Sequence, residues 1–139
     1  DLGATVEDPV DNAHEDGRMT DPDGRRAMLE IKGRSGTLRL SDVRELDQWV
    51  RDHLLDWESK GVLVGNLQLD RPPSERKAVH PDNCVALAKR ADIALLTTTQ
   101  LLQALVSLQQ GDLQPRDFFD AIFTASGPCD LPELEWPRS

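Results

Sequence analysis

The sequence lacks a long hydrophobic run. Apolar residues make up 38% of the 139 residues, and no stretch reaches the ~18 apolar residues that suggest a membrane-spanning helix. We therefore expect no membrane partner. No secretory signal is visible either, so we expect a cytoplasmic protein. The length fits a single domain with a modest core.

Cysteines and glycine-rich motifs are also scarce. Cys84 and Cys129 are the only cysteines, and they lie far apart, without the short spacing of metal ligands. We expect buried or free thiols, as in a reducing cytoplasm. The sequence has no glycine-rich phosphate loop of the P-loop or Rossmann kind, which counts against a sensor of small nucleotides.

The chain has no overall excess of positive charge. Its net charge is −9, which counts against a protein that holds nucleic acid by charge alone. The charge is unevenly distributed: residues 1–23 hold eight acids and one arginine, whereas residues 24–40 hold five basic residues and one glutamate. This basic cluster favours a phosphate-bearing substrate nearby, although charges that protect an edge strand are an equal alternative.

The clearest local motif is a turn. Asp-Pro-Asp-Gly at 21–24 is typical of a type I turn and predicts a β-hairpin with strands near 17–20 and 25–32. Without a bulge at the glycine, Asp16 lies across from Leu29; with a one-residue bulge, it lies across from Glu30. In both registers two carboxylates approach each other on paired strands.

Alternation along the second strand separates two sets of side chains. We expect one face to carry Ala27, Leu29 and Ile31 and the other Met28, Glu30 and Lys32. Glu30 and Lys32 are then predicted to point away from the face that carries the core residues. Two carboxylates bind a hard divalent cation, and a neighbouring lysine orients water or neutralises charge on a phosphate. A solvated strand face with alternating charges is the alternative.

The rest of the chain alternates strands with helices. We expect strands over residues 2–7, 62–66 and 93–98, and helices over 42–57, 83–90, about 99–110 and from 115. Ser41 is the expected N-cap of the first helix, whose apolar stripe comprises Val43, Leu46, Val50, Leu54 and Trp57. This order predicts an α/β domain over residues 1–127, with a mixed central β-sheet flanked by helices, and an extended proline-rich tail over 128–139.

The hairpin and strand order resemble the PD-(D/E)XK nuclease superfamily, which has the restriction-endonuclease-like fold. The resemblance covers roughly residues 2–110 and is carried by Asp16, by Glu30-Ile31-Lys32 and by the turn between them. It implies that Asp16, Glu30 and the Ile31 carbonyl bind Mg²⁺ or Mn²⁺ and that Lys32 assists the attacking water. Two departures are Glu15 in place of a proline before Asp16 and the lack of the family's leading helix, so we expect one part of a longer protein.

The expected function is a divalent-metal-dependent nuclease, with DNA rather than RNA as substrate. The basic residues expected to contact substrate phosphates are Arg34, Arg39, Arg76 and Lys77. The net negative charge of the chain indicates that a partner domain or a second copy in a homodimer supplies part of the contact with the nucleic acid. The alternative function is a catalytically inactive interaction or dimerisation module on the same fold.

Overall fold

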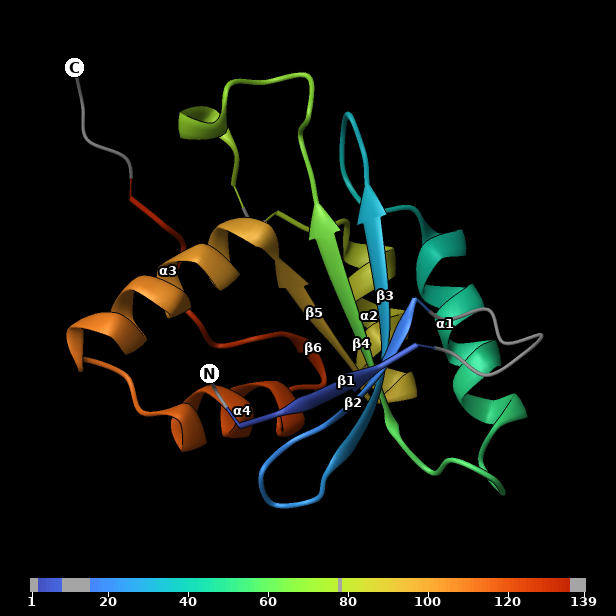
Figure 1. Ribbon diagram of the computed structural model, residues 1–139. Coiled ribbons are helices and arrows are strands. Elements are labelled where there is room, and N and C mark those ends of the chain that lie inside the picture. Colours follow the sequence, from blue (N-terminus) through green and yellow to red (C-terminus); the bar gives the residue numbers. More distant parts are fainter. Residues whose placement is uncertain (1–2, 9–15, 78, 136–139) are drawn as a thin grey trace.

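A six-stranded mixed β-sheet forms the centre of the molecule, as the computed structural model in Figure 1 shows. The structure describes residues 3–8, 16–77 and 79–135. In spatial order, the strands are β1 (Thr5–Glu7), β2 (Gly17–Thr20), β3 (Arg26–Gly33), β4 (Lys60–Asn66), β5 (Ile93–Thr97) and β6 (Gly127–Pro128). The pairs β1–β2 and β2–β3 are antiparallel, and β3 to β6 run parallel. The predicted α/β class with a mixed sheet flanked by helices is confirmed.

Helices cover both faces of the sheet (Figure 1). The helices are α1 (Leu40–Asp52), α2 (Asp82–Ala91), α3 (Thr98–Gln110) and α4 (Pro115–Phe123), with a short 3₁₀ turn, η1, at Pro73–Glu75. One buried cluster joins Leu63 and Leu95 to α1 and α2, and a second joins Val62 and Leu96 to α3 and α4. Residues 61–65 of β4 and 93–96 of β5 are continuously apolar and are buried between the two helical layers. Within the described residues, no helix is long and apolar enough to span a membrane.

The hairpin turn has a one-residue bulge at the glycine, which is one of the two registers that the sequence left open. The Gly24 N–H donates to the Asp21 carbonyl at 3.0 Å, and the Asp21 N–H donates to the Arg25 carbonyl at 2.9 Å. Gly24 has a φ of +84°, a conformation that glycine adopts without steric cost. Gly17 consequently pairs with Leu29, and the register is the one that brings Asp16 towards Glu30.

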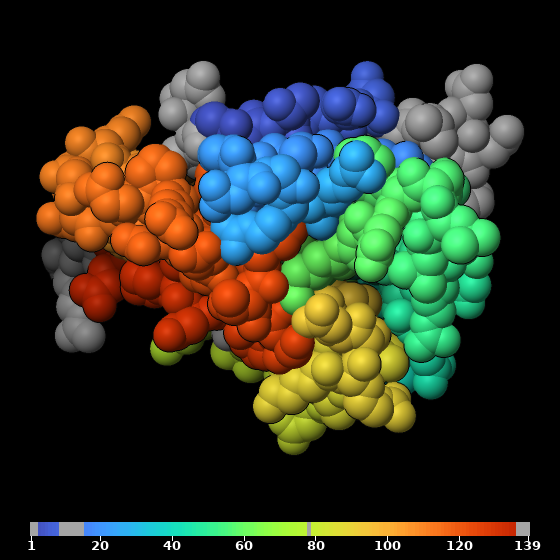
Figure 2. Space-filling view, turned by 90° about the horizontal axis from the view of Figure 1, so that it is seen from below, coloured from blue at the N-terminus to red at the C-terminus, as the bar shows by residue number. Residues whose placement is uncertain are grey.

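Side chains from distant segments hold the hairpin on both sides. The Arg25 guanidinium lies 2.9 Å from the Asp120 carboxylate of α4. On the other side, the guanidinium of Arg26 lies 4.4 Å and that of Arg18 5.2 Å from the centre of the Trp57 ring. Figure 2 shows the hairpin between α4 and the segment that follows α1. These contacts fix the position of β2 and β3, which carry the predicted site.

The prediction that Glu30 and Lys32 point away from the core was wrong. Met28, on the same face of β3, is fully buried beneath α1 and α2, and Glu30 is only 3% exposed. Ile31, expected on the core face, is instead 56% exposed. The alternation of side chains along a strand predicts which of them share a face. Which of them are buried depends on the helices that pack on each face.

The first helix begins and ends earlier than predicted. Its N-cap is Arg39 rather than Ser41, because the Asp42 carboxylate reaches back and accepts a hydrogen bond of 2.9 Å from the Arg39 N–H. Its last turn tightens through a hydrogen bond from the Leu54 N–H to the Arg51 carbonyl. Leu54, predicted in the buried stripe, is therefore 50% exposed.

The segment after residue 127 contributes to the sheet. Gly127–Pro128 forms β6 beside β5, and the Cys129 N–H donates to the Leu95 carbonyl at 2.9 Å. The Gln100 side chain of α3 donates to the carbonyls of Cys129 and Leu131 at 3.2 and 2.8 Å. The beginning of the segment predicted as a tail thus belongs to the folded core. Cys129 is buried and free, as is the other cysteine.

Candidate active site

The Asp16 carboxylate is positioned by the backbone of β3. The N–H of Asp16, the residue before β2, donates to the Leu29 carbonyl at 2.9 Å. Its Oδ2 accepts a hydrogen bond of 2.7 Å from the Ile31 N–H. Because the N–H and C=O of a strand residue point to the same neighbouring strand, the Ile31 carbonyl also points to the Asp16 side of β3. Two oxygen donors of the predicted metal site therefore lie on one side of the strand.

Glu30 is a buried carboxyl group with an unsatisfied oxygen. Its Oε2 has no hydrogen-bond partner among the described residues. Burial raises the pKa of Glu30 to about 8, and the neighbouring Asp16 carboxylate adds to this rise. The positive charge of Lys32 acts in the opposite direction, towards a lower pKa. A cation beside Glu30 and Asp16 would remove the cost of holding both carboxylates ionised.

Lys32 lies between two carboxylates from different elements. Its Nζ is 3.8 Å from Glu30 Oε1 on β3 and 3.8 Å from Glu45 Oε2 on α1. Sequence reasoning missed Glu45, which is half exposed. The order of the elements could have indicated Glu45. Helix α1 follows β3 after a short loop, so its first two turns must pass close to the end of that strand.

Arg34 has a structural partner at the start of α1. Its guanidinium forms a two-point ion pair with Asp42, a carboxylate that is 1% exposed. Burial favours a higher pKa for Asp42, but hydrogen bonds from Arg34 and from the Arg39 backbone outweigh it and lower the pKa. Arg39 itself is exposed and, with Arg34, lines a hollow of about 430 Å³ in the β3–α1 loop. Of these two predicted phosphate contacts, Arg39 has the freer side chain.

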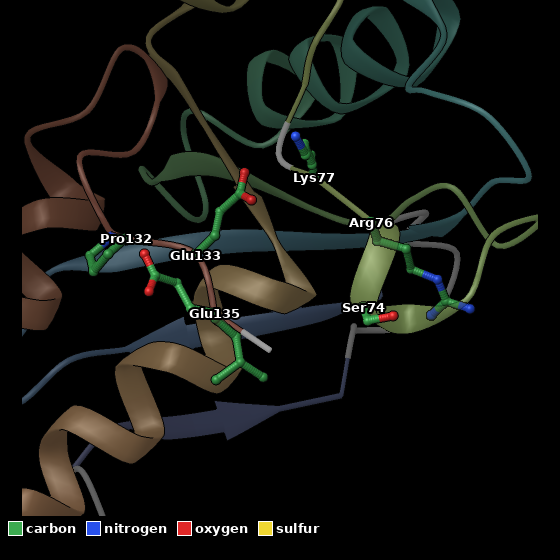
Figure 3. A pocket seen from close by; sticks show the side chains of 7 residues that line it. Ser74, Arg76, Lys77, Pro132, Glu133 and Glu135 are labelled. Carbon is green, nitrogen blue, oxygen red and sulfur yellow. The ribbon is translucent and has the colours of Figure 1, made fainter. Parts of the chain in front are cut away.

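Arg76 and Lys77 belong to a different hollow. It has a volume of about 480 Å³ and lies between the loop after β4 and the C-terminal segment; its lining residues are Ser74, Arg76, Lys77, Pro132, Glu133, Leu134 and Glu135. In Figure 3, Arg76 and Glu135 point away from each other, and Lys77 and Glu133 come from opposite walls. None of the predicted catalytic residues lines this hollow. The structure therefore does not bring these two basic residues into one pocket with Asp16 and Glu30.

The metal-ligand count is low. Within residues 3–8, 16–77 and 79–135, no group of three or more His, Cys, Asp or Glu side chains is placed to hold a metal ion. The candidate donors are thus two carboxylates and one backbone carbonyl. Comparison of the chain with protein-family models, with curated proteins and with solved structures finds no match. The fold and this group of residues therefore carry the proposed function.

Proposed function

We propose that the chain is a divalent-metal-dependent nuclease of the PD-(D/E)XK kind, which hydrolyses phosphodiester bonds in DNA. The observation that carries the proposal is the buried Glu30 carboxyl, with an unpartnered oxygen, a pKa of about 8 and the Asp16 carboxylate beside it. Strongly perturbed carboxyl groups of this kind are concentrated at functional sites. A buried acid pair with a lysine on the same strand face fits metal-assisted hydrolysis better than a role in packing.

The donor set fits a magnesium or manganese ion. Asp16, Glu30 and the Ile31 carbonyl would hold it, since hard cations prefer oxygen ligands and keep several waters. When bound, such an ion stabilises charge on a phosphate and lowers the pKa of a coordinated water. The hydrogen bond from the Ile31 N–H keeps the Asp16 carboxylate in place without any ion. The site is therefore organised in advance by its own backbone.

Lys32 supplies the positive charge of the site. Its ammonium group has three donors, and its two carboxylate neighbours, each 3.8 Å away, hold it over the same face as Glu30. From there it orients a water for attack and donates to a phosphate oxygen as negative charge develops. Arg39, exposed in the adjacent loop, supports the proposal of a polyanionic substrate.

The test is metal-dependent cleavage by matched variants. Asp16→Asn, Glu30→Gln and Lys32→Met each keep the side-chain size, and each is expected to lower Mn²⁺-dependent cleavage by about 10²–10⁴-fold. Glu58→Gln, at an exposed position after α1, is the control and should cleave as wild type. Substrates are single-stranded and double-stranded DNA and RNA, and calorimetry measures Mn²⁺ binding.

Two outcomes separate the proposal from its alternative. Cleavage that persists in all three variants would refute the site assignment. A wild-type protein that neither binds Mn²⁺ nor cleaves any of these nucleic acids would refute the nuclease and favour an inactive interaction module.

A further inference from the structure

The loop between β3 and α1 surrounds a hollow that no acidic side chain lines. The hollow has a volume of about 430 Å³, and its lining residues are Gly33, Arg34, Ser35, Gly36, Thr37 and Arg39. These are glycines, hydroxyl residues and arginines, in a chain whose net charge is −9. Their side chains donate hydrogen bonds and carry positive charge, and none of them repels a negative group. The composition of the hollow therefore selects an anion.

The loop also has backbone donors that the fold does not use. The N–H groups of Ser35, Gly36 and Thr37 have no hydrogen-bond partner among the residues that the structure describes. Successive N–H groups of this kind can form a concave site for an anion. The start of α1 is not the source of these donors, since the Asp42 carboxylate already accepts the Arg39 N–H there.

Two carbonyl groups of the loop are occupied, so they repel an anion less. The Arg34 carbonyl accepts a hydrogen bond of 3.0 Å from the Leu69 N–H, and the Gly36 carbonyl accepts one of 2.8 Å from the Gln68 N–H. Both donors belong to the segment after β4, at the same edge of the sheet (Figure 1). Gln68 has a φ of +56°, which is uncommon for a residue with a side chain and is often found at functional sites. A strained neighbour thus holds the loop in shape.

The two arginines of the hollow differ in how they are held. The Arg34 guanidinium uses Nε and one terminal nitrogen for Asp42, so further N–H donors remain. Its side chain is 25% exposed, against 2% for that of Asp42, so the arginine rather than the carboxylate is open to solvent. Arg39 is exposed and forms no ion pair with a described carboxylate. Arg34 is therefore a fixed wall of the hollow, and Arg39 is a cation available to a ligand.

We propose that the β3–α1 loop binds a phosphate group, held by the N–H groups of residues 35–37 and by the guanidinium of Arg39. Backbone N–H groups and the planar guanidinium both suit phosphate oxygens, and the guanidinium can donate two parallel hydrogen bonds. The site needs neither a metal ion nor cleavage. It is a binding site separate from the carboxylates of Asp16 and Glu30.

The hollow lies beside the candidate active site. It begins at Gly33, the residue after Lys32, and helix α1 contacts both places, through Asp42 at Arg34 and through Glu45 at Lys32. If the ligand is a nucleic acid, the hollow holds a phosphate that neighbours the one that is cleaved. This last assignment rests on the proposed function, whereas the phosphate site itself does not.

Amide NMR of the metal-free protein tests the site without cleavage. Inorganic phosphate and a short single-stranded DNA are titrated at constant ionic strength, and the amide signals of residues 35–37 should shift and saturate with each. Arg39→Met should weaken both interactions by at least about tenfold, because it removes a charged donor. Arg90→Met makes the same charge change at an exposed position near the end of α2 and should match wild type. Circular dichroism checks that each variant is folded.

The outcomes separate this site from the nuclease activity. No saturable shift at residues 35–37 with either ligand, or equal weakening by the two variants, would overturn the phosphate site. Shifts with inorganic phosphate but not with DNA would overturn the assignment to a nucleic acid and indicate a small phosphorylated ligand. Shifts with both ligands, in a protein that cleaves no nucleic acid when Mn²⁺ is added, would support the phosphate site and refute only the nuclease.

Discussion

Helices α1 and α3 have the same length, 13 residues, and cover opposite faces of one sheet, yet their compositions differ completely. Helix α1 has six charged residues: Asp42, Arg44, Glu45, Asp47, Arg51 and Asp52. Helix α3 has none and is capped by Thr97, whose hydroxyl accepts the Gln100 N–H at 3.3 Å. Both helices cover the sheet, so this role does not require charged residues. The charged residues of α1 therefore need another explanation.

Two of the charges on α1 are directed at β3 and the loop that follows it. Asp42 pairs with Arg34 just beyond the end of β3, and Glu45 reaches Lys32 on the strand itself. The helix is thus tied to the strand that carries Glu30. The comparison indicates that α1 supports the candidate active site, whereas α3 provides a neutral outer surface.

The largest effect is expected from the ion pair at the start of α1. Asp42→Ala removes a buried carboxylate that pairs with the partly exposed Arg34 guanidinium and accepts the Arg39 N–H, and we expect a loss of about 4 kcal/mol in the free energy of unfolding. The matched variant on α3 is Gln103→Ala, which removes a hydrogen bond of 3.0 Å to Ser107 and should change stability by less than about 0.5 kcal/mol. Urea unfolding measures both. Equal losses would remove the distinction between the two helices.

The ion pair between Asp42 and Arg34 should also make the free energy of unfolding depend on pH in the acid range. Because the pKa of Asp42 is lowered in the folded state, its contribution is present at neutral pH and disappears as the pH falls through that lowered value. The Asp42→Ala protein should therefore lose less stability on acidification than wild type does.

A second effect follows from Glu30, which lies on the face that α1 covers. Its pKa is about 8 in the folded state against 4.5 without the fold, so the native protein holds a proton that the unfolded chain releases. The free energy of unfolding should therefore fall as pH rises from about 5 to 8, by on the order of 3 kcal/mol. Glu30→Gln should remove this slope and stabilise the metal-free protein at pH 8.

Thermal melts across this pH range measure the effect, and Glu58→Gln should keep the wild-type slope. A wild-type slope that Glu30→Gln leaves intact would show that Glu30 titrates normally. Glu30 would then lack the raised pKa that supports the proposed site, although α1 would remain tied to β3 through Asp42.

The parts of the fold that were predictable from the sequence are those fixed by local chemistry. The Asp-Pro-Asp-Gly turn predicts the hairpin and leaves two registers open, and the bulge at Gly24 in the structure selects the one that brings Asp16 towards Glu30. The apolar runs of β4 and β5 indicate burial on both faces. The family resemblance and the nuclease activity stay predictions, which the proposed experiments test.

Features that depend on long-range packing were not predictable in this way. The burial of Glu30 depends on which face α1 covers, and the approach of Glu45 to Lys32 depends on how that helix lies across β3. Likewise, Gly127–Pro128 has no strand pattern of its own and becomes β6 only because β5 offers a free edge. Each of these features joins segments that are not adjacent in the sequence.

The smallest effect is expected from Glu45, the half-exposed acid that α1 adds to the site. Its negative charge contributes to the raised pKa of Glu30, after burial and Asp16. Glu45→Gln should therefore lower the pKa of Glu30 by less than about one unit, because water screens a half-exposed charge. It should also release Lys32 from one of the two carboxylates that lie 3.8 Å from its Nζ.

Carboxyl NMR titration of Glu30 measures this shift, and Asp52→Asn, at the far end of α1, is the control. A shift with Glu45→Gln alone would show that the first turns of α1 tune the site through charge. An equal shift with both variants would mean that the overall charge of the helix acts instead. No shift with either variant would limit the role of α1 to the ion pair between Asp42 and Arg34, and the two helices would then differ only in how they are anchored.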